Sequence, residues 1–250
     1  PKIGPVQEAI GKYVADMIED GSTLQIGYGG IPDAVVMQLT HKHDLGIHTE
    51  MLVDGMIDLI AAGLVTGARK TLNRFQTGFT FAMGSRRQYE FIHRNPRVQS
   101  HPVDYTNLPH HIMQNDRVVS INNTTQMDLQ GQAASESAGH RHLTGTGGQL
   151  QFVRGAYASR GGKSFMCMSS TYEKGSVRQS RIVSALTHGN VVTTPRTDVM
   201  YVVTEYGLTN LKGKSLAERA RALIGLADPE FREGLEREAR EKNVIPKGFF

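Results

Sequence analysis

Hydrophobic and polar residues follow two different patterns along this chain. Short apolar or β-branched runs bounded by glycine, proline or asparagine predict β-strands. These runs cover residues 24–27, 46–51, 79–83, 118–122, 163–169, 182–186, 191–194 and 200–204. The longer segments between them predict helices at 6–19, 32–39, 57–64, 86–93, 150–159, 216–226 and 228–242. Because strands and helices alternate, the pattern indicates an α/β fold with a mixed, largely parallel sheet flanked by helices.

Three of the predicted helices begin with a recognisable signal. Pro32 occupies the first turn of its helix, where a missing N–H costs nothing. Ser215 can cap the helix at 216–226. Asp228 and Pro229 open the last helix, which has acidic residues in its first turn.

The chain is predicted to form one domain, 1–250, because no linker, internal repeat or change in composition divides it. An apolar fraction of 39% and a charged fraction of 21% are typical of a soluble globular protein. No apolar run approaches the roughly 18 residues that a membrane-spanning helix needs, so no membrane association is expected. The single cysteine, Cys167, excludes an internal disulfide framework and favours the cytoplasm.

The charge balance is mildly basic, with 28 Lys and Arg against 24 Asp and Glu, a net charge of +4. The basic residues are scattered rather than clustered, so a nucleic acid is not expected as a partner, whereas an anionic small ligand is compatible. The chain begins at Pro1 without an initiator methionine, and its N-terminus is therefore treated as a possible cut.

A glycine-rich turn follows the first predicted strand. Gly27, Gly29 and Gly30 lie where this strand gives way to a helix, and such glycines let a ligand approach the backbone closely. The free amides at the helix N-terminus favour a phosphate or a carboxylate. A tight loop that needs positive φ is the alternative explanation. The fingerprint G-x-G-x-x-G fails at Pro32, which excludes a nicotinamide-type site.

A second glycine cluster, at 145–148, precedes the predicted helix at 150–159 and offers backbone amides in the same way. A structural turn is again the alternative, but two such turns in one chain favour a ligand site. A third cluster, at 161–164, imitates the end of a P-loop. Tyr157 stands where that motif needs glycine, and an apolar strand follows where it needs a helix, so a nucleoside triphosphatase is excluded.

The histidines and the cysteine do not predict a metal site or a thiol nucleophile. His41, His43 and His48 lie near acidic residues, but no pair of histidines has the H-E-x-x-H spacing, and a cysteine pair is missing. Cys167 lies in an apolar run, where a thiol packs as a small core side chain and stays protonated.

Glu50 is the strongest candidate for catalysis. A lone glutamate is usually a solvated surface group or an ion-pair partner. This one lies in a mostly apolar segment, 45–53, so its carboxylate is expected to be partly desolvated and close to the first glycine turn. A carboxylate placed in this way can act as a nucleophile.

Seven ordered segments carry a family resemblance that extends from about Ile10 to the C-terminus. They are LQIGYGGIPD (24–33), GIHTEMLVDG (46–55), PVDYTN (102–107), QNDRVVSIN (114–122), DLQGQ (128–132), GTGGQLQFVRG (145–155) and YVVTEYG (201–207). With them the chain resembles the C-terminal half of the acetyl-CoA hydrolase/transferase family, and closely its 4-hydroxybutyrate CoA-transferase and butyryl-CoA:acetate CoA-transferase branch.

The resemblance implies a ping-pong transfer of CoA from a short-chain acyl-CoA to a carboxylate such as acetate, with no cofactor beyond CoA itself as substrate. Glu50 matches the family's catalytic glutamate, which passes through an acyl-glutamyl anhydride to a glutamyl-CoA thioester. Asn122 and the backbone amide of Gly147 or Gly148 resemble the oxyanion donors. The positions expected to line the CoA channel are Gln25, Ile26, Gly27, Tyr28, Gly29, Thr125, Gly148 and Lys174.

The chain departs from the family pattern in three respects. Gln151 stands where aspartate is common, and the run at 122–125 replaces a smaller, more apolar one, which affects the predicted acyl pocket. The family's preceding N-terminal α/β domain, which closes over the site, is absent here and is an expected partner, and a homo-oligomer is expected by resemblance. Two alternatives stay open: a thioester hydrolase that admits water to the anhydride, and a noncatalytic CoA-binding fragment.

Overall fold

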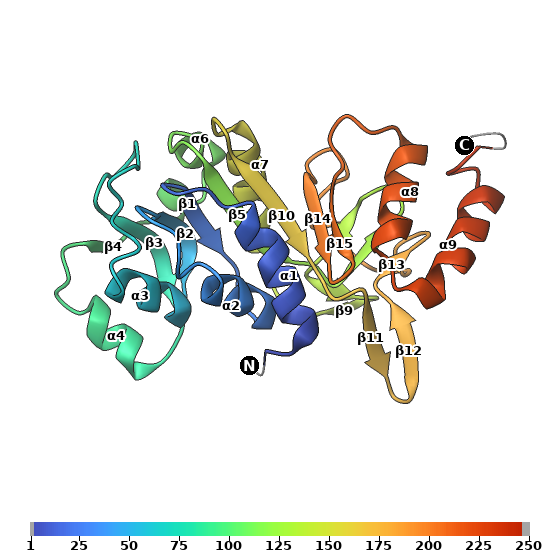
Figure 1. Cartoon of the computed structure of the whole chain (residues 1–250), viewed down its shortest axis with the longest axis horizontal. Coiled ribbons are helices and arrows are strands. Elements are labelled where there is room, and N and C mark those ends of the chain that lie inside the picture. Colours follow the sequence, from blue (N-terminus) through green and yellow to red (C-terminus); the bar gives the residue numbers. More distant parts are fainter. Residues whose placement is uncertain (1–2, 247–250) are drawn as a thin grey trace.

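An eight-stranded sheet forms the middle of the molecule, as seen in the computed structural model, which describes residues 3–246 (Figure 1). Across the sheet the strands follow the order β15-β14-β10-β5-β1-β2-β3-β4. Neighbouring strands run parallel except for β14 and the edge strand β15. Their bounds are β1 (Thr23–Ile26), β2 (Gly46–Leu52), β3 (Thr77–Ala82), β4 (Val98–Ser100), β5 (Val118–Asn123), β10 (Lys163–Cys167), β14 (Tyr201–Thr204) and β15 (Gly207–Asn210). The predicted mixed, largely parallel α/β sheet is confirmed.

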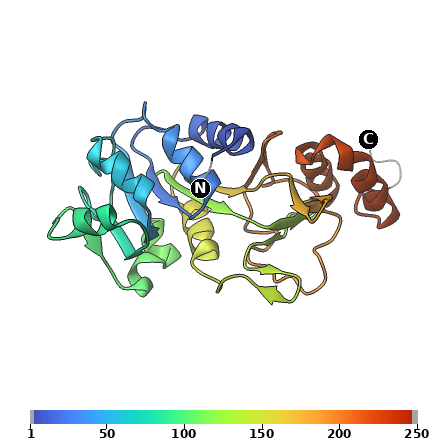
Figure 2. The same ribbon diagram turned by 90° about the horizontal axis from the view of Figure 1, so that it is seen from below.

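Helices cover both faces of this sheet (Figure 2). α1 and α2 pack against each other on one face, α6 and α7 lie on the other, and α8 and α9 pack together beside β14 and β15. Within residues 3–246, no helix is long and apolar enough to cross a membrane. The bounds are α1 (Pro5–Asp16), α2 (Gly30–Met37), α3 (Asp54–Ala61), α4 (Arg86–Ile92), α5 (Val103–Thr106), α6 (Pro109–Ile112), α7 (Gln149–Ala158), α8 (Leu216–Leu226) and α9 (Pro229–Glu241).

The helix starts predicted at Ser215 and Asp228 are confirmed by their hydrogen bonds, whereas the helix that contains Pro32 begins two residues earlier, at Gly30. Ser215 accepts from the N–H of Glu218, and the Glu218 carboxylate accepts from Ser215 N at 2.7 Å, which closes a capping box. Asp228 accepts from the N–H of Glu230 at 3.1 Å, directly before Pro229. These contacts satisfy N–H groups that have no partner inside the helix.

The predicted strand at 191–194 is wrong. The segment makes only an isolated bridge between Thr194 and Ala133, and Val191 and Val192 are 37% and 38% exposed. Its β-branched residues suit a strand, but a strand also needs a neighbouring edge along its length. The predicted strand at 182–186 is likewise reduced to β13. The remaining short strands are β6 (Gln126–Asp128), β7 (Ala133–Ala134), β8 (Ser137–Ala138), β9 (Arg141–His142), β11 (Thr171–Lys174), β12 (Val177–Ser180) and β13 (Ile182–Val183).

The order of the strands reverses between β1 and β5. From β1 the chain proceeds through β2 and β3 to β4 at one edge, whereas β5, β10 and β14 extend towards the other. In open α/β sheets, ligands bind at such a reversal, outside the carboxyl ends of the strands. The first glycine turn leaves β1 at this point, and Asn122 and Asn123 end β5. The topology therefore indicates a ligand site between these two strands.

Candidate active site

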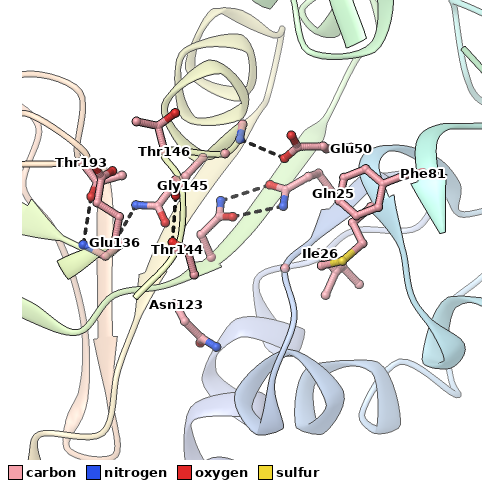
Figure 3. Close-up of a pocket in the computed structure, with 17 residues that line it drawn as sticks. Gln25, Ile26, Glu50, Phe81, Asn123, Glu136, Thr144, Gly145, Thr146 and Thr193 are labelled. Carbon is pink, nitrogen blue, oxygen red and sulfur yellow. Dashed lines mark hydrogen bonds between the residues drawn. The ribbon is translucent and has the colours of Figure 1, made fainter. Parts of the chain in front are cut away.

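A cavity of about 410 Å³ lies at the carboxyl ends of β1, β2 and β5 (Figure 3). Gln25, Ile26 and Gly27 line it from the first strand and its glycine turn, and Glu50 lines it from β2. The second glycine cluster, within 144–149, closes another side of the cavity. The two glycine turns and the glutamate, far apart in sequence, thus meet in one place.

Glu50 is half-buried, and its carboxylate is held by the second glycine cluster. Its Oε2 atom accepts a hydrogen bond of 2.9 Å from the backbone N–H of Gly148. Because Gly148 is the N-cap residue of α7, the carboxylate also lies at the positive end of that helix. The structure therefore places Glu50 in a cavity that it shares with the first glycine turn, near which the sequence predicts it, and with the second glycine cluster, whose Gly148 N–H holds its carboxylate.

The close approach of Glu50 explains why residue 148 is glycine. Its φ of −91° is accessible to other residues, so the backbone conformation does not demand glycine. A Cβ atom here would lie 2.7 Å from Glu50 Oε2 and 2.4 Å from Asn107 Nδ2. Asn107 is 1% exposed and donates to Gln151 Oε1 at 3.2 Å. Glycine therefore lets the loop backbone contact a carboxylate and an amide simultaneously.

Asn122 lines the same cavity, but its amide is engaged by neighbouring side chains. Its Nδ2 atom donates to Gln25 Oε1 at 3.1 Å and to Ser120 Oγ at 2.9 Å. Gln25 Nε2 donates back to Asn122 Oδ1 at 3.1 Å, and Ser120 Oγ donates to Gln25 Oε1 at 2.6 Å. Both Nδ2 hydrogens are thus occupied. For the oxyanion role that the resemblance implies, Asn122 has to release one of these partners.

Six of the eight residues predicted to line the CoA channel fall into two groups. Gln25, Ile26, Gly27 and Gly148 line the Glu50 cavity. Tyr28 instead lines a cavity of about 570 Å³ beside α2 and α3. Gly29 has a φ of +126°, and a Cβ atom there would lie 2.9 Å from Asn123 Nδ2, so this glycine is required by the turn itself.

The second group, Thr125 and Lys174, lies beyond the Glu50 cavity. Both residues line a cavity of about 420 Å³. A smaller cavity of about 260 Å³ shares Asn123 with the Glu50 cavity, and it shares Thr125 and Arg181 with the Lys174 cavity. The three cavities are thus related by shared lining residues, from Glu50 through Asn123 and Thr125 to Lys174.

Several titratable groups are buried without taking part in this cavity. Burial lowers the pKa of His48 to about 4, and its Nε2 donates to the carbonyl of Thr106 at 2.8 Å. Burial also lowers the pKa of Lys70 to about 8. The pKa of Cys167 is raised to about 12 by burial, so its interpretation as a core thiol is confirmed. Among the described residues, 3–246, no group of three or more His, Cys, Asp or Glu side chains is arranged to hold a metal ion.

Polar residues that the sequence did not predict line one wall of the Glu50 cavity. Glu136, which is 5% exposed, and Ser135 line this wall. Gln149 Nε2 donates to Ser135 Oγ at 2.8 Å and to Thr194 Oγ1 at 3.0 Å, which fixes the wall to the start of α7. These residues come from short strands and irregular segments with no periodic pattern. The local signal at 133–138 is a run of small residues, Ala-Ala-Ser-Glu-Ser-Ala, with one acidic residue in it.

The fold and the site define a doubly wound α/β protein with a carboxylate-centred cavity at the reversal of its strand order. Residues 84–239 match the acetyl-CoA hydrolase/transferase C-terminal domain, and the chain belongs to that family. Glu50 and the first glycine turn lie before the matched segment, whereas the second glycine cluster, 145–148, lies within it.

Named relatives match almost the whole chain. Succinyl-CoA:cyclohexane-1-carboxylate CoA transferase from Geobacter metallireducens is 52% identical over 245 residues, covering 98% of this chain and 56% of the relative. 4-Hydroxybutyrate coenzyme A transferase from Clostridium kluyveri is 50% identical over 242 residues, covering 97% and 56%. The crystal structure of RipA from Yersinia pestis superimposes with a TM-score of 0.92 at 48% identity, covering 98% of this chain and 55% of RipA. The chain therefore spans about half the length of these relatives.

Proposed function

We propose that this chain carries the catalytic glutamate of an acyl-CoA:carboxylate CoA-transferase. The observation that supports this most directly is the Glu50 carboxylate, held 2.9 Å from the Gly148 N–H inside a cavity bounded by both glycine turns. The names of the two curated relatives, both CoA transferases, support the same class of reaction.

In the proposed reaction, Glu50 exchanges covalent partners in two steps. Its carboxylate oxygen attacks the thioester carbonyl carbon of an acyl-CoA, the C–S bond breaks, and CoA leaves as a thiolate while an acyl-glutamyl anhydride forms. The thiolate then attacks the glutamyl carbonyl, which forms a glutamyl-CoA thioester and releases the first carboxylate. An incoming carboxylate reverses both steps and leaves as its own CoA ester. Water takes no part, and no electron is transferred.

The backbone amides of the second glycine cluster serve both stages of this chemistry. The Gly148 N–H holds the free carboxylate in place before attack. Once Glu50 is part of the anhydride or the thioester, its negative charge is gone, so this N–H can stabilise a tetrahedral oxyanion. We assign the adjacent Gly147 N–H the same role. Asn122 contributes only after it releases Gln25 or Ser120. Removing one such donor typically lowers the rate about a hundredfold or more.

We propose that CoA occupies the three cavities that share lining residues between Glu50 and Lys174. We place the reacting sulfur beside Glu50 and Gly27, and the more distant parts of CoA past Asn123 towards Thr125 and Lys174. Binding energy from these remote parts can then assist the chemistry at the sulfur.

The proposal includes a partner domain and a substrate range. The chain spans about half the length of its relatives, and we propose that 1–250 acts as a C-terminal catalytic domain together with a preceding α/β domain that excludes water from the cavity. The proposed substrates are short-chain acyl-CoA esters and acids such as acetate, butyrate or 4-hydroxybutyrate. We also propose a homo-oligomer.

Steady-state kinetics on the full-length enzyme test this function. With butyryl-CoA as donor, consumption of the thioester must depend on acetate and must show the parallel-line pattern of ping-pong kinetics. Glu50→Gln keeps the size of the side chain and should abolish transfer. Glu90→Gln, which removes an exposed carboxylate paired with Arg86, is the matched control. Normal turnover in Glu50→Gln refutes the proposal.

The same assay separates the alternatives. Free CoA that accumulates at an equal rate with and without acetate indicates a hydrolase that admits water to the anhydride. Binding of CoA without either reaction indicates a noncatalytic module.

A further inference from the structure

Arg181 lies between β12 and β13, with its half-buried side chain facing two of the three connected cavities. It lines the cavity of about 420 Å³ together with Thr125 and Lys174. It also lines the smaller cavity of about 260 Å³, where Thr125 and Asn123 are its neighbours. Arg181 and Thr125 are therefore the two residues that line both of these cavities.

Within residues 3–246, this guanidinium makes no direct contact with a carboxylate. Nε donates to Ser169 Oγ at 3.2 Å, Nη1 donates to the Thr125 carbonyl at 2.9 Å, and the guanidinium stacks 4.8 Å from the centre of the Tyr172 ring. All three partners are neutral. Glu205, the acid whose charge acts on Arg181, is itself engaged by the N–H and hydroxyl of Ser170 at 2.8 and 2.6 Å.

Burial lowers the pKa of Arg181, while the charges of Tyr172 and Glu205 act to raise it. Within the described residues, 3–246, this half-buried side chain makes no ion pair. The walls of the two cavities that it lines contain no aspartate or glutamate. Lys174 adds a second cation to the larger one. Arg181 and Lys174 give this compartment a positive charge, which a bound anion would neutralise.

A nearby arginine shows the ordinary arrangement. Arg178, on β12, donates to the carboxylates of Asp228 and Glu230, so its charge is neutralised within the protein. The two arginines are three positions apart on the same segment, but of the two only Arg178 forms an ion pair within the described residues. This difference makes Arg178 a matched control.

We infer that Arg181 binds a phosphate group of CoA in the compartment that it shares with Thr125 and Lys174. The inference rests on the proposed function and deepens it, because it names the residue that anchors the anionic end of the substrate. A guanidinium presents a planar fork of N–H donors that matches phosphate oxygens, and Nη2 makes none of the contacts described above. The pantetheine arm would then extend past Asn123 to the sulfur beside Glu50.

Equilibrium binding tests the inference without requiring turnover. Isothermal titration calorimetry on the full-length protein compares CoA, dephospho-CoA and pantetheine as probes of wild type, Arg181→Gln and Arg178→Gln. We expect Arg181→Gln to weaken CoA binding about 10- to 100-fold, the range for a hydrogen-bonded charge, with Arg178→Gln within about twofold of wild type. Pantetheine, which has no phosphate, should bind both variants as it binds wild type.

Dephospho-CoA identifies the phosphate that is bound. If Arg181→Gln weakens CoA and dephospho-CoA equally, the contact is to the diphosphate. If the penalty disappears with dephospho-CoA, the contact is to the 3′-phosphate. Arg181→Lys keeps the charge but not the fork, so it should fall between wild type and Arg181→Gln.

Three results overturn the inference: an equal penalty for pantetheine and CoA, an Arg181→Gln protein that melts like wild type and binds CoA normally, or a wild type that does not bind CoA. Should Arg181→Gln fail to fold, the comparison of Arg181→Lys with wild type across the three probes decides in the same way. Phosphate-dependent binding without acyl transfer would reject the proposed transferase while leaving the role of Arg181 intact.

Discussion

Replacing Gly148 with alanine should displace the Glu50 carboxylate while leaving the glutamate side chain chemically unchanged. The new methyl group would lie 2.7 Å from Glu50 Oε2, 3.0 Å from Glu50 Cδ and 2.4 Å from Asn107 Nδ2. Contacts below 3.0 Å essentially do not occur at real Cβ atoms, so the carboxylate or the loop must move by several tenths of an ångström. The negative φ of residue 148 accepts alanine, so the effect comes from contact rather than from backbone strain.

The expected loss has two sources. Displacing the carboxylate weakens its hydrogen bond to the Gly148 N–H, which as a bond to a charged group contributes about 1.5–3 kcal/mol. Misplacing a reacting group by about 1 Å can cost about a hundredfold in rate. We therefore expect Gly148→Ala to lower kcat for acyl transfer about a hundredfold, with a smaller change in KM.

Stopped-assay kinetics with butyryl-CoA and acetate measure this loss, and Gly145→Ala is the control. Gly145 lies in the same loop, but a Cβ atom there meets no atom within 4 Å, so it reports the effect of a methyl group without the collision. Circular dichroism and thermal melting check that both variants fold. A Gly148→Ala enzyme within twofold of wild type would show that Glu50 does not need the position seen here.

Two further predictions concern the groups around the site. Gln25→Leu removes the partners of Asn122 Oδ1, of one Asn122 Nδ2 hydrogen and of the Ser120 hydroxyl hydrogen, and leaves the bond between Asn122 and Ser120 in place. The free energy of unfolding in urea should therefore fall by about 1–3 kcal/mol, and an unchanged unfolding midpoint would contradict the network. His48 has a pKa of about 4 in the fold against 6.5 in the unfolded chain, so its contribution is present above pH 6.5 and is lost as pH falls towards 4. From pH 7 to pH 5 this costs about 2 kcal/mol, and His48→Gln should lose about that much less stability than wild type over the same interval; identical losses would refute the depressed pKa.

The sequence predicted the elements of the sheet because their cause is local. The first strand, the glycine turn and the helix with Pro32 follow one another, and short apolar runs bounded by turn residues are sufficient to locate them. The same argument fails at 191–194. There the β-branched residues meet no continuous strand edge, and whether an edge is available depends on tertiary structure.

The candidate site was predicted only in part, for a similar reason. Glu50 and Gly148 are 98 positions apart, and their hydrogen bond follows from the order of strands in the sheet rather than from any local spacing. The sequence indicates that both glycine turns can bind anions. It does not indicate that Gln25 and Ser120 occupy the Asn122 amide, that Glu136 lines the Glu50 cavity, or that Arg181 makes no ion pair within the described residues. Each of these depends on side chains brought together from separate elements.

Peptide mapping of a trapped intermediate tests the central claim most directly. The full-length enzyme is incubated with butyryl-CoA, reduced with borohydride or treated with hydroxylamine, digested, and analysed by mass spectrometry. We predict a modification confined to Glu50 and absent from Glu50→Gln. The modified side chain should be an alcohol after borohydride and a hydroxamate after hydroxylamine. A modification on Glu136, or turnover with no modified glutamate at all, would contradict the claim.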